Sequence, residues 1–136
     1  FSVYYALDSV LGFTCVYDVA LRDLQGIDPT WSRAKGFDTS CPLGPWIVMR
    51  DDLDWKDAKI SFTLNGEDVP MASGTTANLI HGIPEQIAAI SSFSTLLPGD
   101  VIMTGTTNAS GHLDPGDETI VHVEGIGDLR NVIVRA

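Results

Sequence analysis

The chain has 136 residues, of which 44% are hydrophobic and 19% charged, and this combination predicts one folded domain and excludes an intrinsically disordered chain. Its 18 acidic residues against 8 basic ones give a formal net charge of −10, without a Lys/Arg cluster, so we expect no nucleic-acid partner. The longest apolar runs, residues 45–49 and 87–90, fall far short of the ~20 residues that cross a bilayer, so we expect no membrane partner either.

Short β-prone runs dominate the first third of the chain. Residues 13–19 follow Gly12 and form an apolar run typical of a buried strand, which leads into a polar loop at residues 22–30. A segment rich in proline and glycine introduces a second apolar run, and we predict a strand at residues 46–49. Polar residues directly after a strand are a common place for chemistry, so the loop at residues 22–30 is a candidate position for a site.

The middle of the chain predicts a β-hairpin. Two β-prone runs, residues 60–64 and 67–71, flank Asn65-Gly66. This pair suits the positive φ angles that a two-residue type I′ turn requires. We therefore expect two antiparallel strands joined at this turn.

One segment has a helical pattern. Leu79, Ile83, Ile87 and Ile90 recur at spacings of three and four. Because proline is tolerated only near a helix start, Pro84 places the helix at about residues 84–92.

The last third again predicts strands separated by turns. We expect a turn at residues 98–100, a Gly-rich loop at 108–117, and strands at 101–104, 119–123 and 130–134. One helix among many short strands predicts a mostly β (α+β) fold with few helices.

The two cysteines and the first residues bear on the compartment. Cys15 and Cys41 are too few for a disulfide framework, and each lies in an apolar segment where cysteine usually acts as a small hydrophobe. We therefore expect a reduced, cytoplasmic protein. Residues 1–11 have no basic n-region and no initiator Met, so they are interpreted as an internal starting point rather than a signal peptide.

Candidate chemistry is sparse when judged from residue types alone. The three histidines lie far apart, which favours surface or structural roles. Asp18 stands out because it interrupts an apolar run, and a buried carboxylate is costly unless something compensates it. Two explanations stay open: Asp18 is held by Arg22 or by backbone N–H groups, or it binds a hard cation such as Mg²⁺, Mn²⁺ or Ca²⁺.

Five collinear segments resemble the fumarylacetoacetate hydrolase superfamily. Residues 12–25, GFTCVYDVALRDLQ, are similar to the family pattern G-Y-T-x-x-N-D-x-S-A-R-D-x-Q, and residues 31–46, WSRAKGFDTSCPLGPW, are similar to W-x-x-x-K-x-F-D-T-x-C-P-L-G-P-W. Three shorter matches follow in order: NGE at 65–67, LPGDVIMTGT at 97–106 and VEGIGDLRN at 123–131. Together they span nearly the whole chain. In the first segment Ala20-Leu21 replaces the family's Ser-Ala pair, which alters loop packing but spares Asp18.

The resemblance implies a metal site. Asp18 falls on the family's metal-binding aspartate, and Thr39 falls near a second cation position of some members. The implied cofactor is Mg²⁺, with Mn²⁺ or Ca²⁺ as alternatives.

The resemblance also implies a substrate site. Arg22 and Gln25 fall on positions that contact the substrate's carboxylate or oxo groups, and Gly105 and Thr106 occupy the turn that approaches the bound acid. Lys35 falls on the family lysine beside metal and substrate, so Lys35 and Arg22 are the implied catalytic residues. Without the resemblance, a solvated Lys35, a structural Arg22 and a turn-forming Thr106 would be the preferred interpretations.

The fold implied is a mixed β-roll or distorted β-sandwich that assembles as a homodimer. The reaction implied is metal-dependent hydrolysis of a C–C bond in a small 2,4-dioxo acid, such as an acylpyruvate in aromatic compound catabolism. Alternatives are isomerisation or decarboxylation of a hydroxymuconate-like dioate and hydration of a 2-hydroxydienoate. A non-catalytic subunit with an incomplete metal site is the alternative from another class.

The family's other metal carboxylates form a Glu-x-Glu pair upstream of the first matched segment, and its catalytic lid residues lie earlier still. Neither is recognisable in residues 1–11. We therefore interpret residues 1–136 as a single, partial catalytic domain. On its own it is expected to be inactive and poorly stable, because a hard cation needs several oxygen donors and missing strands leave unpaired edges.

Overall fold

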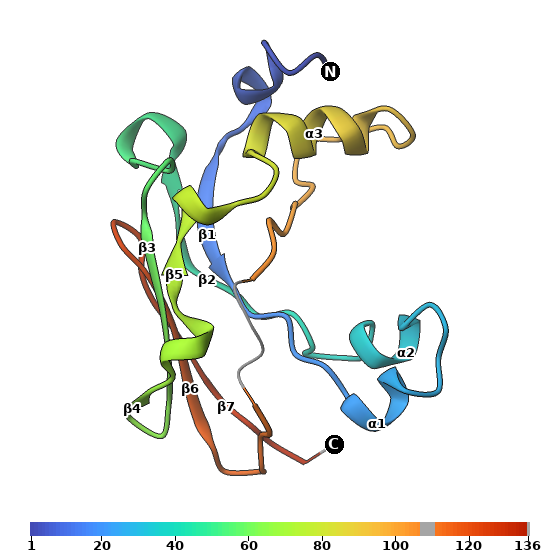
Figure 1. Cartoon of the computed structure of the whole chain (residues 1–136), viewed down its shortest axis with the longest axis vertical. Helices are drawn as coiled ribbons and strands as arrows, with labels where there is room; N and C mark the ends of the chain where they lie inside the picture. Colours follow the sequence, from blue (N-terminus) through green and yellow to red (C-terminus); the bar gives the residue numbers. More distant parts are fainter. Residues whose placement is uncertain (107–110, 136) are drawn as a thin grey trace.

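Two antiparallel sheets pack against each other in a computed structural model, which describes residues 1–106 and 111–135 (Figure 1). The larger sheet has the order β4–β3–β6–β7, with β5 pairing with β3, and the smaller one joins β1 to β2. Their strands are β1 (Gly12–Val16), β2 (Leu43–Met49), β3 (Lys59–Leu64), β4 (Glu67–Asp68), β5 (Gly74–Thr75), β6 (Glu118–Val123) and β7 (Gly127–Val132). The helices are α1 (Arg22–Gln25), α2 (Ser32–Lys35) and α3 (Ile83–Ser91), with 3-10 turns η1 (Ala6–Ser9), η2 (Arg50–Asp52), η3 (Pro70–Ala72) and η4 (Thr76–Asn78).

The predicted hairpin is present, with a shorter second strand. Asn65 and Gly66 have φ angles of 52° and 81°, the positive values that a type I′ turn demands. The second strand was predicted at residues 67–71, but β4 ends at Asp68. Pro70 has no N–H to donate to a ladder and instead starts η3, which explains the early end.

The smaller sheet is irregular. β2 begins at Leu43, three residues before the predicted strand, because Leu43 and Gly44 also pair with β1. The register of β2 against β1 shifts between the pairs Cys15↔Gly44 and Phe13↔Val48. Pro45 lies in this irregular stretch, where its missing N–H leaves no ladder hydrogen bond unmade. β1 ends at Val16 rather than at the predicted residue 19, and the chain beyond it pairs through isolated hydrogen bonds.

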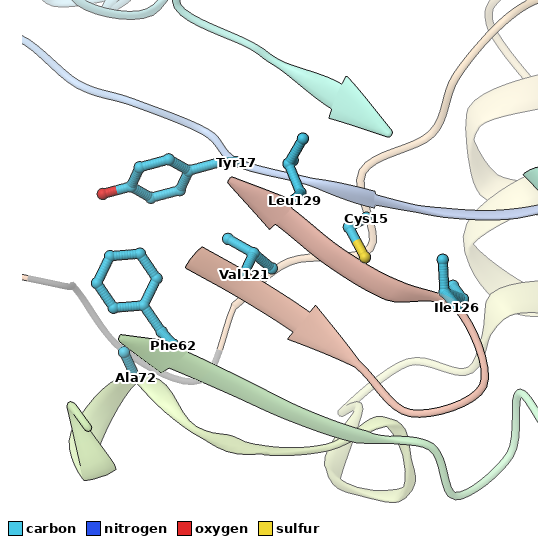
Figure 2. Packing of buried hydrophobic residues seen from close by; sticks show 7 residues of the cluster. All are labelled: Cys15, Tyr17, Phe62, Ala72, Val121, Ile126 and Leu129. Atoms are coloured by element: carbon cyan, nitrogen blue, oxygen red, sulfur yellow. The ribbon is translucent and has the colours of Figure 1, made fainter. Parts of the chain in front are cut away.

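The main core lies between the two sheets. Figure 2 shows Tyr17, which directly follows β1, above Phe62 of the larger sheet, and Cys15 of β1 close to Val121 and Leu129; all five are buried. The rings of Tyr17 and Phe62 have centroids 5.2 Å apart. The thiol of Cys15 is 1% exposed, and burial raises its pKa, so it behaves as the small hydrophobe predicted. Cys41 is exposed, so the same prediction for Cys41 is wrong.

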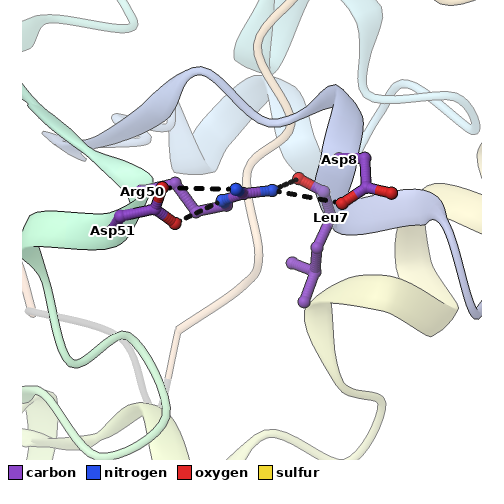
Figure 3. A network of polar contacts seen from close by, with 4 residues as sticks. All are labelled: Leu7, Asp8, Arg50 and Asp51. Carbon is purple, nitrogen blue, oxygen red and sulfur yellow. Dashed lines mark hydrogen bonds and ion pairs between the residues drawn. The ribbon is translucent and has the colours of Figure 1, made fainter.

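The helix α3 and the N-terminal turn η1 form a second, smaller core. Ile83 and Ile87 of α3 pack with the buried Ala6, as the spacing of apolar residues predicted, and α3 starts and ends within one residue of the predicted bounds. Arg50 ties η1 to the end of β2: it donates to the Leu7 carbonyl at 2.7 Å and to the Asp51 carboxylate at 2.8 Å (Figure 3). The Arg50 guanidinium beside Asp51 lowers the pKa of that carboxyl.

Three local predictions from the second half need correction. No strand forms at residues 101–104, because this β-prone run finds no pairing partner among the described residues, and β propensity reports packing on a sheet rather than a backbone preference. The final strand, predicted at 130–134, starts earlier, because a tight turn at Gly125 pairs Val123 with Gly127. Of the Gly-rich loop predicted at 108–117, residues 108–110 lie outside the described residues.

The fold class is confirmed. The structure is mostly sheet with few helices, although its described residues contain three α-helices where one was predicted. α1 and α2 were missed because each is four residues long, too short to carry a periodic pattern. None of the helices in the described ranges is long and apolar enough to span a membrane.

Candidate active site at the end of the first strand

The chain beyond β1 pairs with the segment that leads into β2, but not continuously. Three alternate backbone N–H groups on one side donate to three carbonyls on the other: Tyr17 to Pro42 at 3.1 Å, Val19 to Ser40 at 3.0 Å and Leu21 to Ala34 at 3.0 Å. Residues 35–39 take no part in this pairing, and the stretch from Lys35, the last residue of α2, to Thr39 forms a loop between the second and third hydrogen bonds, called the 35–39 loop below. This irregular ladder fixes where Asp18 and Lys35 lie.

Asp18 and Lys35 form an ion pair. The Lys35 Nζ donates to Asp18 Oδ2 at 2.6 Å although the residues are 17 positions apart, and the side chains are 46% (Asp18) and 31% (Lys35) exposed. The sequence-based expectation that Asp18 is buried is therefore wrong, since the residue lies beyond the end of β1 at the surface. Of the two explanations left open for Asp18, compensation by Arg22 is not what the structure shows, because Lys35 is its partner.

Arg22 and Gln25 lie on the neighbouring helix α1. Arg22 Nη1 donates to Gln25 Oε1 at 2.8 Å, so the two predicted substrate contacts are adjacent on one helical face. Helix α1 contacts α2, whose last residue is Lys35, and Figure 1 shows the two helices next to each other on the stretch of chain between β1 and β2. Four polar side chains named from the sequence thus come from one hairpin of short helices and the strand end before it.

An ion pair that the sequence reasoning missed closes the loop between these helices. Arg33 holds Asp28 with two parallel hydrogen bonds, from Nε at 2.8 Å and from Nη2 at 2.6 Å. These hydrogen bonds lower the pKa of the Asp28 carboxyl, so it stays ionised to a lower pH than an unpaired aspartate. Opposite charges on either side of the turn at Pro29 were the sequence feature that could have predicted it.

The remaining predicted residues occupy two exposed segments. Thr39 has a φ of 65° and its hydroxyl donates to the neighbouring Asp38 carbonyl at 2.6 Å. Gly105 and Thr106 are exposed, and Gly105 has a φ of 106°, a value that favours glycine. Cys41 Sγ lies 3.8 Å from Met103 Sδ, which brings the segment before Gly105 alongside the segment that follows the 35–39 loop.

The donor set for a metal is incomplete within the described residues. They contain no group of three or more His, Cys, Asp or Glu side chains placed to hold a metal ion. Asp18 offers one hard oxygen ligand at an accessible position. Mg²⁺ often binds through one or two carboxylates and keeps several waters or substrate oxygens, so Asp18 fits as one member of such a set.

Two surface hollows in the described parts of the chain involve none of these residues. One of about 360 Å³ lies beside Arg50, between Asp8 and Met49, and one of about 440 Å³ lies along α3, between His81 and Ile90. These hollows therefore add no residue to the candidate site described above.

The chain is similar in sequence to proteins of one known family. A family model described as fumarylacetoacetate (FAA) hydrolase C-terminal matches residues 2–134. A Mycobacterium tuberculosis protein is 45% identical over 133 residues, which are 96% of this chain and 49% of that protein. An Escherichia coli oxaloacetate tautomerase is 39% identical over 122 residues, 86% of this chain and 55% of that protein.

Solved structures give the same result. The crystal structure of a 5-carboxymethyl-2-hydroxymuconate delta-isomerase from Mycobacterium smegmatis superposes with a TM-score of 0.94 at 43% identity, covering 100% of this chain and 53% of that one. The chain thus spans about half the length of the relatives it matches.

Proposed function

This chain belongs to the fumarylacetoacetate hydrolase family, and we propose that it carries part of a divalent-metal-dependent site that enolises a small 2-oxo acid. The observation that carries this proposal is the ion pair between Asp18 and Lys35, at 2.6 Å. A carboxylate and an ammonium group from separate segments meet at an accessible point, beside a helix that presents Arg22 and Gln25. Such a site can hold a cation and an anion together.

Each side chain has a role that its chemistry permits. Arg22 binds the substrate carboxylate, since a guanidinium is suited to planar recognition of that group, and Gln25 orients the Arg22 side chain through the 2.8 Å hydrogen bond. Lys35 donates to the oxygen that gains negative charge as the substrate enolises. The backbone turn at Gly105 and Thr106 approaches the other end of the acid.

Asp18 would hold the metal. A bound divalent cation supplies Lewis acidity at the 2-oxo group. The further oxygen donors come from water, from the substrate, and from outside these 136 residues, either from the rest of the protein or from a second subunit in a homodimer.

Proton relocation along a 2-oxo acid, as in a tautomerase or isomerase, is the reaction we favour. Two similar proteins are named for it, an oxaloacetate tautomerase and a hydroxymuconate isomerase. Hydrolysis of a C–C bond in an acylpyruvate is the second candidate, because its leaving group is also an enolate that Lys35 would stabilise, and the family takes its name from that chemistry.

The test is a substrate screen with the complete protein. Enol–keto conversion of oxaloacetate, isomerisation of 5-carboxymethyl-2-hydroxymuconate and hydrolysis of acylpyruvates are followed by their ultraviolet absorbance. We expect turnover of at least one substrate, lost after treatment with EDTA and restored by Mg²⁺ or Mn²⁺. Turnover that survives complete removal of metal, or none with any of these acids, would contradict the proposed function.

A further inference from the structure

We propose that Ser40 is a positioning residue that closes the neck of the 35–39 loop and so holds Lys35 against Asp18. The inference rests on the proposed function of those two residues. Ser40 lies at the variable position of the segment FDTSC, and nothing in its sequence context marks it as part of a site.

Three hydrogen bonds converge on Ser40. Its hydroxyl donates to the Lys35 carbonyl at 2.7 Å, its own carbonyl accepts from the Val19 N–H at 3.0 Å, and its N–H donates to the Phe37 carbonyl at 3.1 Å. The residue is 6% exposed and is one of two buried polar residues in the described chain. Burial of a hydroxyl costs free energy unless the hydroxyl is hydrogen-bonded, and the Ser40 hydroxyl has such a bond.

These bonds connect the backbones of the two ion-pair partners. Val19 directly follows Asp18, so the hydrogen bond from the Val19 N–H to the Ser40 carbonyl fixes the position of Asp18 relative to the opposite segment. The bond from the Ser40 hydroxyl fixes the carbonyl of Lys35. Ser40 therefore links both sides of the ion pair through a path of two hydrogen bonds.

The loop explains why a side chain is needed for this link. The backbone ladder passes from Ser40 directly to Ala34, so no backbone N–H of the opposite segment bonds the carbonyl of Lys35. Thr39, with a φ of 65°, turns the chain so that Ser40 rejoins the ladder. The Ser40 hydroxyl then spans the neck of the loop. Alanine has no donor for this purpose, whereas threonine keeps one.

The kinetic test compares three variants of the complete protein on the substrate that the screen identifies. Ser40→Ala is expected to lower kcat by roughly 10- to 100-fold, the scale of a misplaced catalytic group, with KM within about threefold. Ser40→Thr is expected to restore most of the loss. Ser73→Ala is the matched control, because the Ser73 hydroxyl also donates to a backbone carbonyl, that of Val69 at 3.3 Å, on a different element. It should leave both constants unchanged.

A structural measurement keeps the test independent of activity. In Ser40→Ala we expect faster amide hydrogen exchange at Val19 and Leu21, and a crystal structure in which the Lys35 and Asp18 side chains have separated. If the wild type proves inactive, the proposed function fails while this measurement still decides the role of Ser40. Should Ser40→Ala not fold, Ser40→Cys, similar in size but a weak donor, replaces it. Unchanged exchange at both amides, or wild-type kcat in a folded variant, would overturn the inference.

Discussion

Replacing Asp18 with alanine is expected to abolish metal-dependent turnover while the protein still folds. Asp18 is the hard oxygen donor at the point where Lys35 and the helix hairpin meet, and no cluster of three or more metal-binding side chains exists in the described ranges to replace it. Loss of a group that merely supports a metal ligand typically costs about 10- to 100-fold in affinity or activity, so loss of a ligand should cost more. Folding should survive because the side chain is 46% exposed.

Two further variants separate the possible causes of that loss. Asp18→Asn keeps the size of the side chain and removes its charge, and it should be nearly as inactive as the alanine variant. Asp52→Ala removes the same charge from an exposed position in η2 and should have no effect. Calorimetric Mg²⁺ affinity is the measurement, and wild-type affinity in Asp18→Ala would show that the cation binds elsewhere.

Replacing Lys35 with methionine is the second change with a large expected effect. Methionine keeps an unbranched side chain but cannot donate to the developing enolate oxygen, so kcat should fall by about 10²- to 10³-fold, the cost of losing one such donor. In the proposed site Lys35 would share the Asp18 carboxylate with the bound cation, so its removal should leave Mg²⁺ affinity unchanged or higher. The two variants therefore differ in metal binding although both lose turnover.

Lys59→Met is the matched control for this prediction. Lys59 is exposed on β3, among residues that belong to no part of the candidate site, so the variant should keep wild-type kcat and KM. Weaker Mg²⁺ binding in Lys35→Met, measured under the same conditions, would contradict the assignment of the two roles.

Local sequence patterns predicted the elements that local physics determines. Asn65-Gly66 defined a hairpin because its two residues must adopt positive φ angles, and the spacing of Ile83 and Ile87 defined α3 because both face one apolar neighbour. The strand predicted at 101–104 failed for the converse reason. A strand requires a partner, and the identity of that partner is not contained in the run of residues itself.

The candidate site, too, was predicted only in part from the sequence. The family resemblance implied that Lys35 lies beside the metal that Asp18 would bind, and the structure brings the two side chains together. The burial argument for Asp18 is wrong, because β1 ends before it. Helices of four residues, the excluded 35–39 loop and the bond that closes it depend on tertiary contacts, so no periodicity predicts them.

The most direct test of the proposed site is a crystal structure of the complete protein soaked with Mn²⁺, with the metal located by its anomalous scattering. We expect a Mn²⁺ peak at about 2.0–2.6 Å from an Asp18 carboxylate oxygen, the range of hard-cation distances, with Lys35 and Arg22 directed at the same space. Mn²⁺ bound away from Asp18, or no bound ion at this position, would contradict the assignment of the metal site.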